Sequence, residues 1–527
     1  MFQYYISAFI AGFSLMTIEL ISSRIVAPLI GSSIFTWTSI IGIILLGLSI
    51  GNLLGGRIAD RYVKIYKKRV LSISFLISAF FVYLIIPLSK NLDFIIDPSY
   101  SIITHSILVC IFLYLFPSIA IGTISPIIFN LYVNNIENIG KKYGLLSGLW
   151  SFGSILGVFI TGFYFISKIG SSGSIYFISF VFILLFYFFY INSMSKSSIY
   201  LKYHVLFLII IFIIFFILLY SKKENSLSKN VIYQKETPYY QAKVVNYDIF
   251  PQFGKNKLLF LDIDSHSIHT ENRSKYFYTD IYPIFPAFSK KIDRIHIIGA
   301  GAYTLPIHFR EQYPNSQISV SEIDPEIEII GKNYFDLDKY NIKTEVGDAR
   351  MKFTKNNTIN DKYDLIYGDA YNSFISVPWH LLTTEFVDSI KDNLNNNGIY
   401  AINFIGSLEG KNSKIFESIY KTINISFPNN YIFAFGTDPK MIQSITIIAV
   451  KNSKYIDYET LKKDLGIIDP SLFLSRILFN KKNLDEKNDI ENAQILTDNF
   501  SPIEYMMENI MKEYYSKYFK IYRKIMI

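Results

Sequence analysis

Seven long apolar stretches occupy the first 221 residues, and they limit the folds open to this chain more than any other feature. They lie near residues 4–30, 36–56, 70–89, 102–132, 144–167, 172–192 and 201–220. Each is long enough to cross the hydrocarbon core of a bilayer, which takes about 20 residues. Residues 1–30 lack the basic start of a cleaved signal peptide, so we expect them to stay in the mature protein. The sequence therefore predicts a membrane domain of about seven transmembrane helices over residues 1–221.

Charge divides the chain at the same point. Residues 1–221 carry 13 Lys and Arg against 5 Asp and Glu, whereas residues 222–527 carry 38 of each sign. The net charge of +8 therefore belongs to the membrane domain, and the polar half is neutral. Because nucleic-acid binding needs a basic surface, nucleic acid is not expected as a partner. The expected partner of the N-terminal half is the lipid bilayer.

Two charged residues, Glu19 and Arg24, lie inside the first apolar stretch. Ionisable groups are costly in hydrocarbon and often mark a pathway or a binding site, so both are candidate functional residues. The alternative is a structural role in helix packing. Five residues is a poor spacing for a pair on one helix, so we expect partners on other helices. Glycines 42, 47, 51, 55 and 56 in the second stretch predict close helix packing.

The polar half begins with a linker over residues 222–235. Short alternating runs then predict a small β-rich unit over residues 236–290, with a helix over 276–289. Strands and helices alternate over residues 291–455, which predicts a doubly wound, Rossmann-like domain of the methyltransferase type. Residues 456–527 are richly charged and predict a helical C-terminal extension.

Glycine and acidic residues follow the predicted strands of the Rossmann-like domain. The first strand ends in GAGAYTLP, which contains Gly299 and Gly301, and the second ends at Glu322, 21 residues past Gly301. Glycines at this point let backbone amides approach a ligand, and the acidic residue can accept both ribose hydroxyls. The pattern falls short of G-x-G-x-x-G because the sixth position is Thr304. It therefore favours an S-adenosyl compound over NAD.

Two further acidic residues follow the third and fourth strands. VGDAR places Asp348 and Ala349 after the third strand, and YGDAYNS places Asp369 after the fourth. Ligands of such folds bind at the carboxyl edge of the sheet, so Asp348 is positioned for the adenine amino group and Asp369 for the reacting atom. Taken alone, either aspartate could equally be present only because aspartate stabilises the turn that follows a strand.

These segments carry a family resemblance. YYQAKVV, the glycine turn, SEIDPEI, VGDAR, YGDAYNS and LLTTEFVDSIKDNL resemble the spermidine synthase (polyamine aminopropyltransferase) family. ILTDNFSPIEYM and the first two apolar stretches resemble the branch that is fused to a multi-spanning N-terminal region. The loop GGRIADRYVKIYKKR resembles that of major facilitator superfamily transporters, over about half of such a transporter.

The resemblance implies residue roles and substrates. It implies that Gln241 contacts the nucleoside ligand, Glu322 the ribose and Asp348 the adenine, with Asp369 as the general base. It further implies decarboxylated S-adenosylmethionine as co-substrate and putrescine or another polyamine as acceptor, with no metal. The implied substrate-binding residues are Asp280, Tyr371 and Asn372.

Three positions depart from the family pattern. The glycine turn has Ala302 where the family usually has Asp, the second Asp of D-x-x-D is Asn372, and Thr279 and Asp280 follow Tyr278 in place of His or Gln and Glu. Each change removes charge or a hydrogen bond from a site that would bind cations.

These departures leave alternatives open. Ala302 leaves room for the carboxylate of intact S-adenosylmethionine, which would favour a methyltransferase acting on a membrane-proximal acceptor. A transport or binding protein with a degenerate synthase domain is a third reading. The lone cysteine, Cys110, excludes an internal disulfide, the seven histidines form no grouped ligand set, and a homo-oligomer is left open.

Orientation in the membrane follows from the loops. Residues 57–69 carry six basic residues against one acidic residue, which predicts a cytoplasmic loop and an N-terminus inside the cell. Seven crossings would then put the polar half outside. Because the cofactor is made inside, we favour one re-entrant or surface-lying stretch. The expected location is the cell (inner) membrane, multi-pass, with a cytoplasmic catalytic domain.

Overall fold

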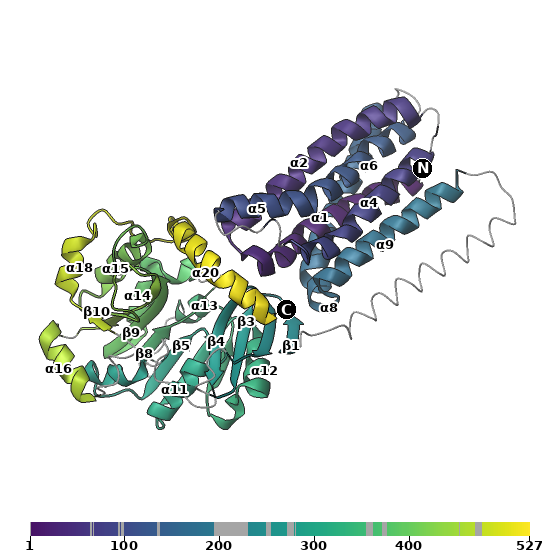
Figure 1. Ribbon diagram of the computed structural model, residues 1–527. Coiled ribbons are helices and arrows are strands. Elements are labelled where there is room, and N and C mark those ends of the chain that lie inside the picture. Colours follow the sequence, from purple (N-terminus) through teal and green to yellow (C-terminus); the bar gives the residue numbers. More distant parts are fainter. Residues whose placement is uncertain are drawn as a thin grey trace. The chain divides into compact units, whose positions relative to one another are not determined.

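A computed structural model describes the chain as two compact units. One comprises residues 1–229 with 236–240, and the other comprises residues 230–235 with 241–527. The described residues are 2–63, 66, 68–92, 95, 100–133, 138–193, 230–248, 254–270, 279, 281–354, 362–371, 377–452, 454–468 and 477–526, with side chains described as far as residue 518. Each unit is considered by itself below (Figure 1).

Six helical spans in the N-terminal unit are long and apolar enough to cross a membrane, counted over the described residues. They confirm the first six predicted stretches, while the seventh, residues 201–220, lies outside the described residues. Spans two, four and five each contain a five-residue π turn (η1, η2 and η3). The elements are α1 (Phe2–Ile30), α2 (Ile34–Ile58), η1 (Ala59–Val63), α4 (Lys68–Ser89), α5 (Ile102–Cys110), η2 (Ile111–Leu115), α6 (Phe116–Tyr132), α7 (Ile139–Ile160), η3 (Thr161–Phe165), α8 (Ile166–Lys168) and α9 (Gly170–Ile191).

Glycines bring two pairs of spans into close contact, α1 with α7 and α2 with α6. A third pair is α4 with α9. A Cβ added at Gly51 of α2 would lie 2.3 Å from the Ile119 carbonyl oxygen, and one at Gly153 of α7 would lie 2.0 Å from that of Phe9. The two backbones can approach this closely only because glycine has no side chain. Close van der Waals packing of this kind favours the association of helices in a bilayer, where the hydrophobic effect does not. The glycine prediction for α2 holds at residues 47, 51 and 55, whereas residues 42 and 56 face open space.

Glu19 and Arg24 are both partly exposed on α1. Neither has a hydrogen bond or ion pair to another residue in the described part of the structure, so the expected partners on other helices are not found there. The resemblance to half of a transporter stays a prediction.

The polar unit begins with a four-stranded sheet in the order β1-β2-β3-β4. Its strands are β1 (Val231–Glu236), β2 (Gln241–Asn246), β3 (Asn256–Leu261) and β4 (Asp264–Thr270). The β2–β3 and β3–β4 pairs are antiparallel, and the register shifts between Leu259 and Phe260. Val245, Leu258 and Phe260 form part of a small core on one face. The predicted helix over residues 276–289 is instead a short 3₁₀ helix, η5 (Tyr282–Ala287), among its described residues, which is consistent with its two prolines.

An eight-stranded mixed sheet forms the centre of the polar unit and confirms the Rossmann-like, methyltransferase-type fold. The order is β12-β10-β11-β9-β8-β5-β6-β7. Strands β5 to β9 are parallel, whereas β10, β11 and β12 run antiparallel to their neighbours. The strands are β5 (Arg294–Ile298), β6 (Gln317–Glu322), β7 (Lys343–Val346), β8 (Tyr363–Gly368), β9 (Leu394–Gly406), β10 (Asn430–Ala434), β11 (Gln443–Val450) and β12 (Ile477–Phe479).

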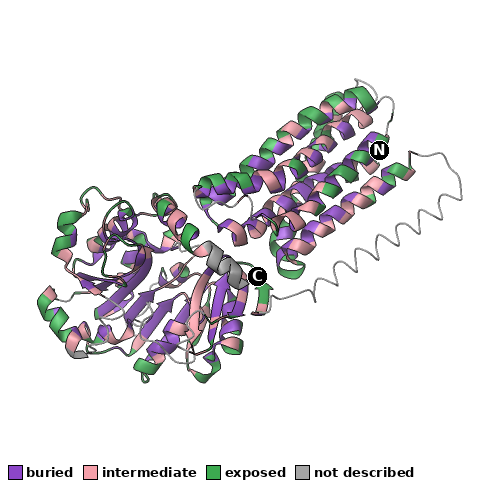
Figure 2. Cartoon of the chain, viewed as in Figure 1, coloured by how far each residue is buried: buried purple, intermediate pink, exposed green. Residues whose placement is uncertain are grey.

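Helices cover this sheet, and its strands β5, β8, β10 and β11 are mostly buried (Figure 2). One group of packed elements is η5, α11 and α16, and another is α13, α14 and α15. Every residue of β8 is buried, as a strand covered on both faces requires. Phe285 and Phe309 stack between η5 and α11. The helices are α11 (Thr304–Gln312), α12 (Pro325–Tyr334), η6 (Leu337–Lys339), α13 (Ala349–Phe353), η8 (Trp379–Leu381), α14 (Thr384–Asp392), α15 (Lys414–Ser426), α16 (Tyr458–Ile468), α18 (Lys481–Lys487), α19 (Ile503–Met506) and α20 (Glu508–Met526).

Candidate active site

Four neighbouring strands end at one edge of the eight-stranded sheet, and a predicted site residue follows or closes each of them. In the sheet order β8-β5-β6-β7, these residues are Asp369, Gly299, Glu322 and Asp348. Backbone bonds tie the strand ends together: Asp369 N donates to Ile298 O at 2.9 Å. The carboxyl edge of a doubly wound sheet is where such folds bind ligands. The structure thus brings the four residues to one edge.

The glycine turn after β5 has a backbone that requires glycine. Gly299 has φ +93° and Gly301 has φ +51°, in the region that L side chains avoid. A Cβ at Gly299 would lie 2.6 Å from the Asp369 carbonyl oxygen, and one at Gly301 would lie 2.6 Å from Ser267 Oγ. Ala302 N donates to the same hydroxyl at 2.8 Å. The small sheet therefore contacts the glycine turn through Ser267 of β4, a residue that no sequence motif singled out.

Glu322 closes β6 and is almost fully buried. Its Oε2 accepts from Ala300 N at 3.0 Å and its Oε1 from Asp324 N at 3.0 Å. Burial raises the pKa of this carboxyl above its ordinary value, and the backbone N–H donors oppose the shift. Because a carboxylate oxygen has two lone pairs, each oxygen can accept one further hydrogen bond. That is what two ribose hydroxyls would require.

Asp348 follows β7 and caps the helix α13. Its Oδ1 accepts from Arg350 N at 2.8 Å, and its Oδ2 lies 3.4 Å from Nε2 of His380. Ala349, the first residue of α13, is buried. This capping hydrogen bond is the local structural role that the sequence analysis gave as the alternative for Asp348. It also orients the carboxylate at the sheet edge.

Asp369 is held by a residue that the motifs did not reveal. Asn403, buried in the middle of β9, donates from Nδ2 to Asp369 Oδ1 at 2.9 Å and to the Tyr371 hydroxyl at 3.0 Å. Its Oδ1 accepts from Ser444 Oγ at 2.6 Å and from Thr446 Oγ1 at 3.3 Å. The available signal was a polar residue inside the apolar run GIYAINFIG.

Asn403 has one amide orientation that satisfies all its neighbours. An ionised carboxylate only accepts hydrogen bonds, so the NH₂ group must face Asp369, and the two hydroxyls on β11 then donate to the amide oxygen. The arrangement presents an oriented carboxylate beside a phenol at the sheet edge. Such a pair can bind an amine and take a proton from it.

The remaining predicted residues are spread around this edge. Gln241 begins β2, and its backbone N–H donates to Asp262 Oδ1 at 2.9 Å. Tyr371 is partly buried and accepts from Asn403 as described above. Asp280 and Asn372 lie outside the described residues. No group of three or more His, Cys, Asp or Glu side chains suited to a metal occurs among the residues that the structure describes.

Comparisons with known proteins add to this geometry. No protein-family model matches the chain. A polyamine aminopropyltransferase of Vibrio vulnificus is 29% identical over 219 residues, covering 41% of this chain and 70% of that protein. Polyamine aminopropyltransferase 2 of Aquifex aeolicus is 23% identical over 431 residues, covering 79% of this chain and 81% of that protein.

Solved structures match the chain at lower sequence identity than these relatives do. A probable spermidine synthase from Corynebacterium glutamicum has a TM-score of 0.43 and 18% identity, covering 51% of this chain and 97% of its own. Spermidine synthase from Thermotoga maritima has a TM-score of 0.35 and 18% identity, covering 46% of this chain and 88% of its own.

The Rossmann-like fold, the site at its carboxyl edge and these relatives class the chain with transferases. More particularly, the chain is similar in sequence to polyamine aminopropyltransferases, the enzymes of the spermidine synthase family. The alignment with the Aquifex protein is longer than residues 222–527, so it includes part of the N-terminal apolar half.

Proposed function

We propose that this protein is a membrane-bound aminopropyltransferase that moves the aminopropyl group of decarboxylated S-adenosylmethionine to putrescine or a related polyamine. The observation that carries the proposal is the carboxylate of Asp369, which Asn403 orients beside Tyr371 at the edge where the glycine turn and Glu322 also lie. The polyamine aminopropyltransferase relatives support it.

The donor nucleoside would lie across the ends of β5, β6 and β7. Glu322 would accept the ribose hydroxyls, and Asp348, with Ala349 beside it, would accept the adenine amino group. Gly299 and Gly301 would let the backbone approach the ribose and the sulfonium. Gln241, at the start of β2, would contact the same nucleoside from the small sheet.

The chemical step needs a base and an activated carbon. Asp369 would take one proton from the acceptor ammonium, and the freed nitrogen lone pair would attack the carbon beside the sulfonium. A new C–N bond forms while the C–S bond breaks, and methylthioadenosine leaves with the electron pair on sulfur. The sulfonium is already a good leaving group, so orientation and proton removal are what the protein would supply.

The acceptor would bind on the β8 side of the site. Tyr371 would contact its amine, with Asp280 and Asn372 as further binding residues. Because Asn372 and Ala302 replace charged family residues, fewer carboxylates would pair with the ammonium groups than in the family pattern. A weaker affinity for short diamines is therefore expected.

Methyl transfer from intact S-adenosylmethionine is the second candidate. Position 302 carries a buried methyl group, so no carboxylate at that position would repel the carboxylate of the intact cofactor. A membrane-proximal acceptor would then receive a methyl group, and S-adenosylhomocysteine would be the product.

One experiment separates the candidates. Detergent-purified protein would be incubated with putrescine and decarboxylated S-adenosylmethionine, and in parallel with S-adenosylmethionine and membrane lipid, with products read by mass spectrometry. We expect spermidine and methylthioadenosine from the wild type and from the exposed control Asp338→Asn, with loss of both in Asp369→Asn. S-adenosylhomocysteine would favour the second candidate. Neither product would favour a transport or binding protein with a degenerate synthase domain.

We further propose that the polar unit faces the cytoplasm of an inner-membrane protein. Six described spans with the N-terminus inside return the chain to the inside after α9. Protease treatment of intact cells would test this. Cleavage between residues 454 and 468 from outside would contradict it.

A further inference from the structure

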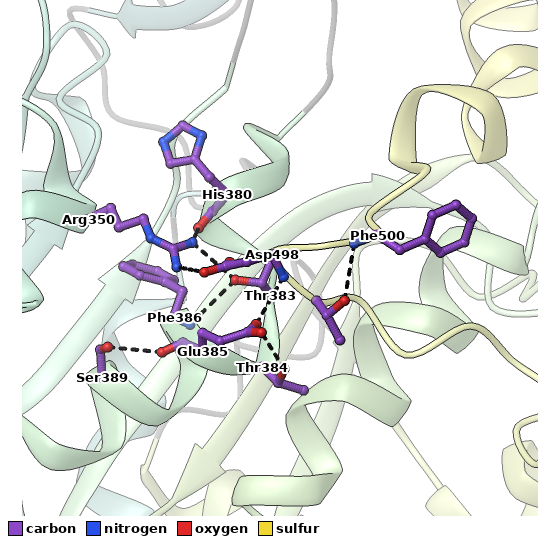
Figure 3. A network of polar contacts seen from close by, with 10 residues as sticks. Arg350, His380, Thr383, Thr384, Glu385, Phe386, Ser389, Asp498 and Phe500 are labelled. Atoms are coloured by element: carbon purple, nitrogen blue, oxygen red, sulfur yellow. Dashed lines mark hydrogen bonds and ion pairs between the residues drawn. The ribbon is translucent and has the colours of Figure 1, made fainter.

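A segment near the C-terminus, residues 496–500, is fixed to the helices that cover the sheet; we call it the C-terminal strap. Leu496 is fully buried, and its carbonyl oxygen accepts from Thr384 N, the first residue of α14, at 2.8 Å. Asp498 N donates to Glu385 Oε2 at 3.1 Å (Figure 3). The strap therefore has a defined position on α14 although it lies more than 100 residues further along the chain.

Arg350 joins this strap to the predicted adenine end of the site. Its guanidinium pairs with the carboxylate of Asp498. It also donates from Nη1 to the His380 carbonyl oxygen at 2.6 Å and to Thr383 Oγ1 at 3.1 Å (Figure 3). The backbone N–H of the same arginine donates to Asp348 Oδ1. One residue thus holds Asp348, the His380 loop and the strap together.

The carboxylate of Asp348 is contacted on both oxygens as a result. Oδ1 is held by the Arg350 amide, and Oδ2 lies 3.4 Å from the His380 ring. An isolated exposed ion pair would contribute little. Here the Arg350 side chain is only 19% exposed, and its planar fork reaches three acceptors, so its geometry is well determined. The direction in which Asp348 presents its free lone pairs depends on that geometry.

We propose that the C-terminal strap is part of the adenine subsite, and that Asp498 acts through Arg350 as a positioning residue that aims Asp348 at the 6-amino group of the base. This rests on the proposed function only in requiring that a nucleoside binds at this edge. Asp498 itself touches no ligand in this proposal. Its effect is on base selectivity.

Selectivity between two nucleosides tests the proposal. Binding of 5′-methylthioadenosine and of its inosine counterpart to the full-length detergent-solubilised protein would be measured by calorimetry. The inosine base replaces the 6-amino donor with a carbonyl acceptor, which a carboxylate repels. In Asp498→Ala we expect the preference for the adenine form to fall about tenfold, as the loss of one well-aimed hydrogen bond implies, with recovery in Asp498→Glu.

The control is Glu328→Gln on α12, which removes another ion pair, with Lys332, and should leave the preference unchanged. Equal weakening of both nucleosides in Asp498→Ala, or an unchanged preference, would overturn the proposal and leave the strap a packing element. A wild type that prefers the adenine form while making no spermidine would refute only the aminopropyl reaction. A wild type that binds neither nucleoside would overturn both.

Discussion

Replacing Asn403 with alanine should slow the transfer step rather than weaken the binding of the donor. The Asn403 amide donates to Asp369 Oδ1 at 2.9 Å and therefore holds this carboxylate in one orientation. A hydrogen bond to a charged group contributes about 1.5–3 kcal/mol, and about 1.4 kcal/mol corresponds to a tenfold change in rate. Loss of this bond should therefore lower kcat/KM by about ten- to a hundredfold.

The expected loss of rate follows from the orientation of the base. A general base must lie within hydrogen-bond reach of the proton that it removes, so a carboxylate that has lost its fixed orientation takes this proton less efficiently. The assay is aminopropyl transfer, with kcat/KM and donor affinity measured separately.

A matched control lies on the same strand. Asn395 at the start of β9 donates to Asp364 Oδ1 at 2.8 Å, an equivalent amide–carboxylate pair away from the carboxyl edge. Asn395→Ala should leave kcat/KM unchanged. If Asn403→Ala also leaves kcat/KM unchanged, or weakens donor binding by as much as it lowers kcat/KM, the positioning argument is wrong.

Three further predictions follow from close contacts and burial. Gly153→Ala should lower the thermal unfolding midpoint of the membrane unit in detergent because its Cβ would meet the backbone of α1, whereas Gly148→Ala, in open space, should not. Gly299→Ala should abolish activity and destabilise the polar unit, read by product formation and by thermal unfolding, because its Cβ would lie 2.6 Å from the Asp369 carbonyl oxygen at φ +93°. Burial lowers the pKa of His296 to about 3, so the unfolded chain binds the extra proton below its ordinary pKa of 6.5. The free energy of unfolding should therefore fall as the pH falls from about 6.5 to 3, by at most about 1.4 kcal/mol per pH unit. Denaturant titrations should show a smaller loss per pH unit in His296→Gln than in the wild type, and an equal loss would contradict this prediction.

Local patterns in the sequence were sufficient for the first six spans and for the order of the strand ends. Apolar length alone marked the first six spans, because the thickness of a bilayer sets the length of a helix that crosses it. In the polar half, glycine or acidic residues after each strand placed Gly299, Glu322, Asp348 and Asp369 in the right order. Their convergence follows because the carboxyl ends of parallel strands meet at one edge of the sheet.

Other features needed three dimensions. The helix expected over residues 276–289 is a short 3₁₀ turn in its described part, because prolines interrupt the regular backbone bonding that periodicity alone assumes. Whether Glu19 and Arg24 have partners on other helices depends on which helix faces meet, and the spacing of residues along one helix does not determine this.

What the sequence by itself determined is the six long apolar helices, the Rossmann-like half and the residues that end its strands. Only the tertiary structure decided that Asn403 orients Asp369, that Ser267 contacts the glycine turn, and that Arg350 reaches Asp498. The physical reason is sequence separation: a turn or a helix is specified by residues a few positions apart, whereas a hydrogen bond across 34 or 148 residues exists only once the layers have packed.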